Sequence, residues 1–286
     1  MPCSVPDRPP PDILGPPSAA GGLDAGQLRA YLARLGVGRL QPPSLPFLTR
    51  LQRRHLLRVP FENLDILWGI PVPLGVQGAW SKVVERRRGG FCYELNGLFG
   101  AALNALGFRV SYLSARVWRK AERAWGPDHD HLLLAVHLGQ DYLVDVGFGD
   151  SFRSPMPLVP AVQSDVSGAY RLVAGEWSDE LVLEHSSGHD RWRPLFRLSR
   201  QPRSLEEFAA MNAWQQSSPD SPFVGHGIFT LARPWGRLTL TERHAIETRR
   251  GRIHRVRLAP GELVHRLRRL HGVRGPLGPS APSFAA

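Results

Sequence analysis

The sequence predicts an α+β fold in which a helical region is followed by regions rich in strands. Apolar residues recur at three- and four-residue steps up to Gly107, and short segments that alternate apolar and polar residues follow from Phe108. Successive strands without intervening helices favour an antiparallel sheet or a small barrel. After residue 203 the pattern changes again, to a helix, four strand-like segments and a closing helix.

The helix signals can be placed in order along the chain. Asp24 is a cap for a helix that ends at Gly36, and Ser44 starts a second helix that stops before Pro60. Further helices are expected over 80–87, from residue 92 to Gly107, after the capping-box sequence 204–207, and over 260–271.

The strand signals are equally regular. The expected strands are 108–118, 131–137, 141–147, 170–173, 181–185, 192–198, 228–232, 237–241, 244–249 and 252–258. Residues 138–140 are a plausible hairpin connection between the second and third of these strands.

Composition divides the chain into five segments. The ends are rich in Pro and Gly and predict a disordered leader over 1–22 and a flexible tail over 273–286. Between them we expect a helical unit over 23–107, a strand-rich unit over 108–203 and a third unit over 204–272.

The chain has 286 residues, 42% of them hydrophobic, which suffices for a sizeable core and more than one domain. Its formal net charge of +11 permits an anionic partner, either nucleic acid or a phosphate-bearing small molecule. The basic residues are scattered instead of gathered into one arm, which weakens the nucleic-acid interpretation.

The two cysteines do not suggest a disulfide framework, because Cys3 lies in the Pro-rich leader and Cys92 at a helix start. A reducing compartment is therefore expected. No apolar run reaches membrane-spanning length, and the first residues lack a signal-peptide pattern. We expect a cytoplasmic protein without a membrane partner, and the sequence leaves the oligomeric state open.

Cys92 is the candidate nucleophile. It follows Gly89 and Gly90 and falls in the first turn of an amphipathic helix, where free N–H groups and the helix dipole favour an anion. We therefore expect the pKa of this thiol to lie below its ordinary value. A buried structural cysteine is the alternative.

A nucleophilic cysteine needs a base and a group that orients the base. The candidate bases are His129, His131 and His137, and Asp145 is the candidate orienting carboxylate. An Asp inside an apolar segment is costly unless it is paired, and an imidazole on a neighbouring strand is a natural partner. Alternation does not separate His129 from His131, because residues two apart share a strand face.

Several blocks of sequence together resemble the arylamine N-acetyltransferase family. The blocks are 31–35 (YLARL), 59–64 (VPFENL), 88–96 (RGGFCYELN), 131–134 (HLLL) and 145–149 (DVGFG), with a weaker similarity over 212–223. Their order and spacing agree with the family from residue 24 to about residue 225. The joint occurrence is specific, whereas any one block alone is weak.

The resemblance implies a Cys92–His131–Asp145 triad on a cysteine-protease-like scaffold. The expected architecture is an N-terminal helical bundle, a central antiparallel β-barrel and a C-terminal α/β lid. The implied reaction moves an acetyl group from acetyl-CoA to an aromatic amine or hydrazine through an acyl-cysteine, with ping-pong kinetics. No bound cofactor or metal is implied. The interval between His131 and Asp145 is slightly short for the family, so His129 stays open as the base.

The resemblance also implies an apolar, aromatic acceptor pocket and a donor entrance. The residues expected in the acceptor pocket are Phe61, Val117, Trp118, Phe148 and Phe223, each of which is alternatively an ordinary core residue. Gly147, Phe148 and Gly149 resemble the loop that lines the donor entrance. Arg88, Glu94 and Asn96 are expected to hold the helix start instead of touching substrate.

Three other functions are alternatives for this sequence. An amide synthase that closes a polyketide macrolactam resembles this sequence equally in the triad. A thiol hydrolase would use the same triad on water or peptides, although the block around Cys92 argues against it. A basic nucleic-acid binder is the alternative without catalysis, and its binding would depend on salt but not on Cys92.

Overall fold

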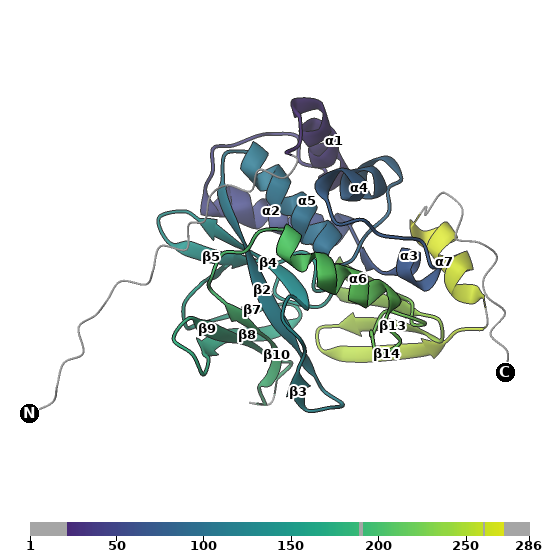
Figure 1. The fold of residues 1–286 in the computed structure, drawn as a ribbon. Coiled ribbons are helices and arrows are strands. Elements are labelled where there is room, and N and C mark those ends of the chain that lie inside the picture. Colours follow the sequence, from purple (N-terminus) through teal and green to yellow (C-terminus); the bar gives the residue numbers. More distant parts are fainter. Residues whose placement is uncertain (1–21, 189–190, 260, 272–286) are drawn as a thin grey trace, which may run out of the picture.

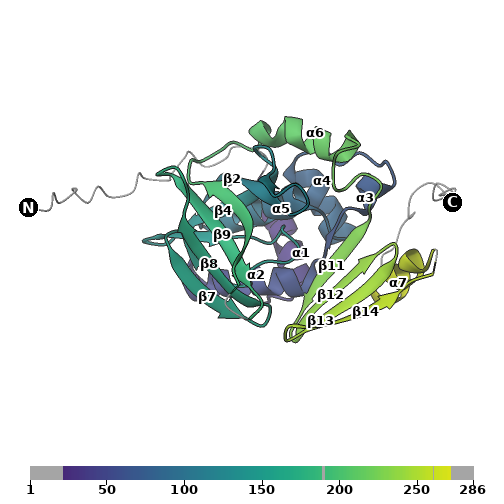
Figure 2. The same cartoon turned by 90° about the horizontal axis from the view of Figure 1, so that it is seen from below.

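The computed structural model describes residues 22–188, 191–259 and 261–271. The expected leader, apart from residue 22, and the expected tail lie outside the described residues. The described chain is an α+β structure that contains a nearly closed antiparallel β-barrel (Figures 1 and 2).

The barrel is formed by one sheet with the strand order β6-β5-β4-β2-β10-β9-β8-β7, and β3 pairs with β2. The edge strands β6 and β7 contact each other, which nearly closes the sheet. The strands are β2 (Arg109–Arg119), β3 (Ala124–Trp125), β4 (His131–His137), β5 (Asp141–Val144), β6 (Met156–Pro157), β7 (Ala161–Asp165), β8 (Gly168–Ala174), β9 (Glu180–Ser186) and β10 (Arg193–Ser199).

A second antiparallel sheet has the order β1-β11-β12-β13-β14. Its strands are β1 (Phe61–Glu62), β11 (Ile228–Arg233), β12 (Gly236–Thr241), β13 (His244–Arg249) and β14 (Arg252–Arg257). Phe61 pairs with Thr230 and Glu62 with Phe229, so a short strand from the helical part of the chain forms one edge of this sheet.

The helices lie mainly between the two sheets (Figure 2). They are α1 (Ala25–Leu35), α2 (Leu45–Arg58), α3 (Leu64–Leu67), α4 (Val76–Trp80), the π-helix η1 (Ser81–Glu85), α5 (Cys92–Ala105), the 3₁₀-helix η2 (Glu206–Phe208), α6 (Ala209–Ser217) and α7 (Glu262–His271). None of these helices, within the part of the chain that the structure describes, has the length and hydropathy needed to cross a bilayer.

The cap signals read from the sequence are confirmed at the first helix. The Asp24 carboxylate accepts a hydrogen bond from the Gln27 N–H at 2.8 Å, and Gly36 ends the helix in the left-handed conformation with φ of 68°. At the expected capping box, Glu207 accepts from the Ser204 N–H at 2.7 Å, but the chain first forms the 3₁₀ turn η2. The remaining helix predictions agree closely with the structure, except for the third.

Two features differ from the expectations. The helix expected over 80–87 becomes the π-helix η1 and stops at Glu85, because Lys82 turns inward to buried carboxylates and Arg87 adopts a positive φ of 54°. The strand expected over 141–147 ends at Val144, so Asp145 lies just past the strand. The short strands β1, β3, β6 and β7 carry too few residues for a periodic signal.

Strand β4 lies between the hydrophobic core of the helices and that of the barrel and contributes to both. Leu132, Leu134 and Val136 pack with α5 and the other helices, whereas Leu133 and Ala135 face the interior of the barrel. Both faces of the strand are thus buried, which accounts for its continuous apolar run. The strand carries His131 at its first position, directly beside the start of α5.

A chain of buried charges fixes the backbone that leads into α5. Arg88 forms paired hydrogen bonds with Glu62 and a bond of 2.6 Å to Asp65. Lys82 lies 3.0 Å from both Asp65 and Glu94, and Glu94 accepts from the Phe91 N–H at 3.0 Å. The expectation that Arg88 and Glu94 hold the helix start is therefore confirmed.

Replacing Lys82 by Met should destabilise the fold. Burial alone would lower the pKa of Lys82, but the charges of Glu94, Glu62 and Asp65 outweigh it and raise that pKa. Removal of this cation leaves the buried Glu94 carboxylate without an ion-pair partner, although Arg88 still pairs with Glu62 and Asp65, and we expect a loss of about 3–5 kcal/mol in the free energy of unfolding.

Urea unfolding of the two proteins measures this loss. The matched control is Lys120→Met, because Lys120 is the other lysine of the chain and is exposed. Equal stability of the Lys82→Met protein and the control would contradict the assigned role.

Candidate active site

Cys92 is buried, with 3% of its surface exposed, and is the first residue of α5. The preceding backbone is pinned to β1, because the Glu62 N–H donates to the Gly90 carbonyl at 2.9 Å. A side chain at Gly89 would overlap the Pro60 carbonyl oxygen and the Glu62 side chain, so only glycine allows this approach. The close approach fixes where α5 begins and hence where the thiol lies.

His131 and Asp145 form a buried pair. The His131 Nε2 lies 3.1 Å from the Asp145 Oδ2, and both side chains are almost fully shielded from solvent. An ionised carboxylate only accepts, so Nε2 carries the proton and Nδ1 keeps a lone pair. The imidazole is therefore oriented with Nδ1 available as a base.

Asn96, one helical turn after Cys92, holds this pair in place. Its Nδ2 donates to the Asp145 Oδ1 at 2.9 Å and to the Leu132 carbonyl at 2.7 Å, and its Oδ1 accepts from the Val146 N–H at 2.9 Å. The Gly147 N–H also donates to the Asp145 Oδ1, at 2.8 Å. Helix α5 is thereby tied both to β4 and to the segment that carries the carboxylate.

Cys92 and His131 line the same pocket, which has a volume of about 490 Å³. Phe148 packs edge-on against the His131 ring with 5.2 Å between ring centroids. The ring centroids of Phe61 and Phe223 are 6.1 Å apart. The thiol and the imidazole thus face a cavity with aromatic walls. Such a cavity suits a flat, largely apolar ligand.

The expected lowering of the thiol pKa is wrong for this environment. Burial raises the pKa of Cys92 well above its ordinary value, and the carboxylates of Asp130 and Asp145 add to this rise. Hydrogen bonds from the Leu132 and Tyr93 N–H groups act in the opposite direction but do not outweigh burial. Removal of the proton from Cys92 therefore depends on a base in the pocket.

The structure distinguishes the candidate histidines. The His129 ring packs edge-on against Phe208 at 4.9 Å and approaches Glu207, and it does not line the pocket. His137 is hydrogen-bonded to Asp141 at the far end of β4. His131 alone among the three shares the pocket with Cys92.

Six of the seven residues expected to bind substrate line this pocket, namely Phe61, Val117, Trp118, Gly147, Phe148 and Phe223. Gly149 does not line it, and a side chain at this position would meet Thr230 and Phe61. The lining residues that sequence reasoning missed are Arg119, Lys120, Ala121, Glu122, Asp130, Gln215, Asp220, Pro222 and Ile228.

Asp130 is the missed residue with the clearest chemistry. It is buried, and burial raises the pKa of its carboxyl group. The Gln215 side chain of α6 donates to the Asp130 Oδ1 at 3.0 Å. The position of Asp130 directly before His131 is visible in the sequence, whereas its contact with Gln215 on α6 is not.

Comparison with known proteins identifies the family of this chain. A family model described as N-acetyltransferase matches residues 44–273. An arylamine N-acetyltransferase of Mycolicibacterium smegmatis is 36% identical over 237 residues, which cover 80% of this chain and 85% of the relative. The pineal gland isozyme NAT-3 of Gallus gallus is 36% identical over 228 residues, 73% of this chain and 79% of that protein.

The similar solved structures indicate the same family. The arylamine N-acetyltransferase from Mycobacterium abscessus superposes with a TM-score of 0.81 at 33% identity, covering 87% of this chain and 90% of that one. The Mycobacterium marinum enzyme in complex with CoA has a TM-score of 0.78 at 33% identity, with coverage of 86% and 92%. This chain therefore belongs to the arylamine N-acetyltransferase family, and the resemblance of its sequence blocks is confirmed.

Gly147→Ala should impair activity by displacing the segment that follows Asp145. The added methyl would lie 2.8 Å from the Asn96 Nδ2 and 2.9 Å from the Cys92 Cα. A shift of about 1 Å in reacting groups can lower a rate by about 100-fold, and we expect a decrease of that order in kcat/KM.

The control is Gly38→Ala, because a methyl at Gly38 meets nothing within 4 Å. Acetylation assays on both variants, with thermal unfolding as a check on folding, measure the effect. An unchanged kcat/KM for Gly147→Ala would show that this close approach is not needed.

Proposed function

We propose that this protein transfers an acetyl group from acetyl-CoA to the nitrogen of an arylamine or arylhydrazine through an acyl-cysteine at Cys92. The observation that carries the proposal is the pocket shared by Cys92 and a His131 ring whose Nε2 is engaged by Asp145. Family membership supports the donor, since the Mycobacterium marinum relative binds CoA. The names of the relatives support the acceptor.

In the first half-reaction the Cys92 thiol proton passes to the His131 Nδ1 as the sulfur attacks the thioester carbonyl carbon. Because burial raises the pKa of the thiol, its attack requires that His131 accept the proton. We assign stabilisation of the oxyanion to N–H groups in the first turn of α5. The C–S bond to CoA then breaks, and the imidazolium returns its proton to the departing thiolate.

In the second half-reaction the acceptor nitrogen attacks the acetyl-cysteine carbonyl carbon. His131 takes a proton from that nitrogen, and the bond between carbonyl and Cys92 sulfur breaks to release the amide. The proton on Nδ1 returns to the sulfur, so the enzyme is regenerated without any cofactor. Asp145 keeps the ring in one orientation through both halves and stabilises its charged form.

Phe148 is the central residue of the proposed acceptor site, since its ring already packs against His131. Phe61, Phe223 and Trp118 supply the remaining aromatic wall, and Val117 adds apolar surface. Flat rings of a substrate pack well on such surfaces. We assign Gly147 to the floor of the site and Gly149 to support of the Phe61 wall.

We also propose the division of the chain into the helical bundle over 23–107, the barrel over 108–203 and the lid over 204–272. The division is supported by the element order, although β1 of the first segment pairs with β11 of the last. A cytoplasmic location is proposed on the use of free thiol chemistry, which a reducing compartment preserves.

Macrolactam synthesis would use the same thiol and base, so the acceptor decides between the two functions. The pocket of about 490 Å³ is of the size taken by small ligands and favours the arylamine. Turnover of acetyl-CoA with aniline or a simple arylhydrazine supports the proposal. Failure with every simple amine, together with lactam closure of an acyl chain, would replace it.

Cys92→Ser should keep the fold and lose acetylation of aniline by a factor on the order of 10⁴ or more, because the nucleophile is removed. The matched control is Cys3→Ser, which removes the other cysteine and should leave the rate unchanged. Initial-rate assays at varied concentrations of acetyl-CoA and aniline should give the parallel lines of a ping-pong mechanism.

Two results would count against the proposal. A Cys92→Ser protein that still acetylates aniline at the rate of the control would exclude the acyl-cysteine. Peptide hydrolysis faster than acetyl transfer would instead favour the thiol hydrolase.

A further inference from the structure

A second cavity, of about 240 Å³, lies on the other face of the β1–β11 pair from the active-site pocket. Successive strand residues point to opposite faces, and the two linings follow this alternation. Phe61 and Ile228 line the pocket of Cys92, whereas the register partners Glu62 and Phe229 line the second cavity. The two cavities are therefore separate sites with one shared wall.

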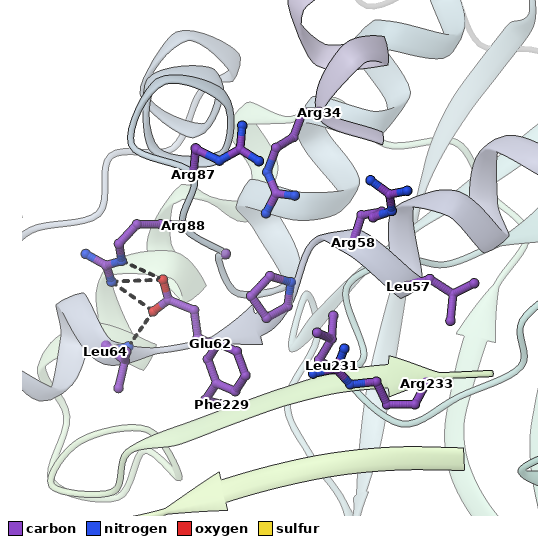
Figure 3. Close-up of a pocket in the computed structure, with 12 residues that line it drawn as sticks. Arg34, Leu57, Arg58, Glu62, Leu64, Arg87, Arg88, Phe229, Leu231 and Arg233 are labelled. Carbon is purple, nitrogen blue, oxygen red and sulfur yellow. Dashed lines mark hydrogen bonds and ion pairs between the residues drawn. The ribbon is translucent and has the colours of Figure 1, made fainter. Parts of the chain in front are cut away.

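The second cavity is strongly basic (Figure 3). Arg34 comes from the end of α1, Arg58 from the end of α2, Arg87 from the turn after η1, and Arg233 from the end of β11. We call these four residues the arginine cluster. Figure 3 shows Arg34, Arg58 and Arg87 on one side of the cavity, opposite side chains of β11.

The cluster lacks compensating charge. Among residues 22–188, 191–259 and 261–271, no carboxylate forms an ion pair with any of its four members. Glu62 is the acidic residue in the lining, and its carboxylate is already engaged by Arg88 and the Leu64 N–H. The cavity therefore keeps an excess of positive charge.

The protein bears a cost for gathering these groups. Burial, together with the charges of Arg87 and Arg58, lowers the pKa of Arg34 to about 10. Arg87 holds a positive φ of 54° two residues after the end of the π-helix η1, and both features are uncommon and concentrate at functional sites. An anion in the cavity would relieve the repulsion among the guanidinium groups.

The rest of the cavity lining is largely apolar. Its apolar residues, which we call the apolar wall, are Leu57, Pro60, Leu64, Phe229 and Leu231. Guanidinium groups match phosphate oxygens through paired hydrogen bonds, and the apolar wall adds room for a small organic group. A bare inorganic ion would leave that wall without a partner.

We propose that the arginine cluster and its apolar wall form a binding site for a small phosphate monoester, separate from the acetyl-transfer site. The phosphate lies against Arg34, Arg58, Arg87 and Arg233, and the organic group packs against Phe229 and Leu231. Arg88 of this lining donates to Glu62, whose N–H in turn donates to the Gly90 carbonyl.

Titration calorimetry with phenyl phosphate tests the proposal on the full chain. Binding should be saturable, and the Arg34→Gln and Arg87→Gln variants should each raise Kd by about tenfold or more through loss of a charged hydrogen bond. Arg58→Gln provides a variant at an exposed position, where folding is not at risk. Arg53→Gln and Arg86→Gln are controls, since both are exposed arginines outside the cavity and should change Kd less than twofold.

Competition separates this cavity from the active site. Phenyl phosphate should still bind after Cys92 has been acetylated, and inorganic phosphate should bind more weakly because it leaves the apolar wall empty. Three results would overturn the proposal: no saturable binding, binding of equal strength in the Arg34→Gln, Arg87→Gln and Arg58→Gln variants, or complete displacement of phenyl phosphate by aniline. The last would place the ligand in the pocket of Cys92. Loss of acetyl transfer in Cys92→Ser leaves this result unaffected, so the two proposals fail independently.

Discussion

The hydrogen bond between His131 and Asp145 is the constraint on which the rest of the site depends. It joins the first residue of a barrel strand to a residue just past the next strand, and Asn96 of α5 ties both to the helix that carries Cys92. Three hydrogen bonds to the Asp145 carboxylate offset the cost of burying it, and the carboxylate fixes the tautomer of the imidazole. The helical and β parts of the fold therefore meet at Cys92, His131 and Asp145.

A second set of buried charges controls the backbone instead of the reaction. Burial alone would raise the pKa of Glu62 and Asp65, but the charges of Lys82 and Arg88 outweigh it and lower both. These paired groups hold the glycine-rich approach to α5 against β1. Such networks give one defined geometry more than they give stability, because their desolvation penalty is large. Burial works against ionisation of the Cys92 thiol, so its reaction depends on the defined position that these charges give to the start of α5.

Local signals in the sequence were enough to predict α1, α5, β4 and the hairpin to β5, because each has a clear period and a clear end. Cys92, His131 and Asp145 stood out as polar groups in apolar or glycine-rich settings. The pairing of Phe61 with Thr230 and the contact of Gln215 with Asp130 could not be predicted, because they join distant segments through register. The raised thiol pKa was missed for a similar reason: the helix start is a local feature, whereas burial comes from the whole fold.

The proposed reaction places a covalent acetyl group on the Cys92 sulfur atom, and this group can be observed directly. The protein is mixed with acetyl-CoA, digested and analysed by mass spectrometry, and a second sample is chased with aniline before digestion. We expect one acetyl group on the peptide containing Cys92, lost to aniline at a rate at least equal to kcat. An acetyl group on another residue, or one that stays on Cys92 while acetylated aniline accumulates, would contradict the account.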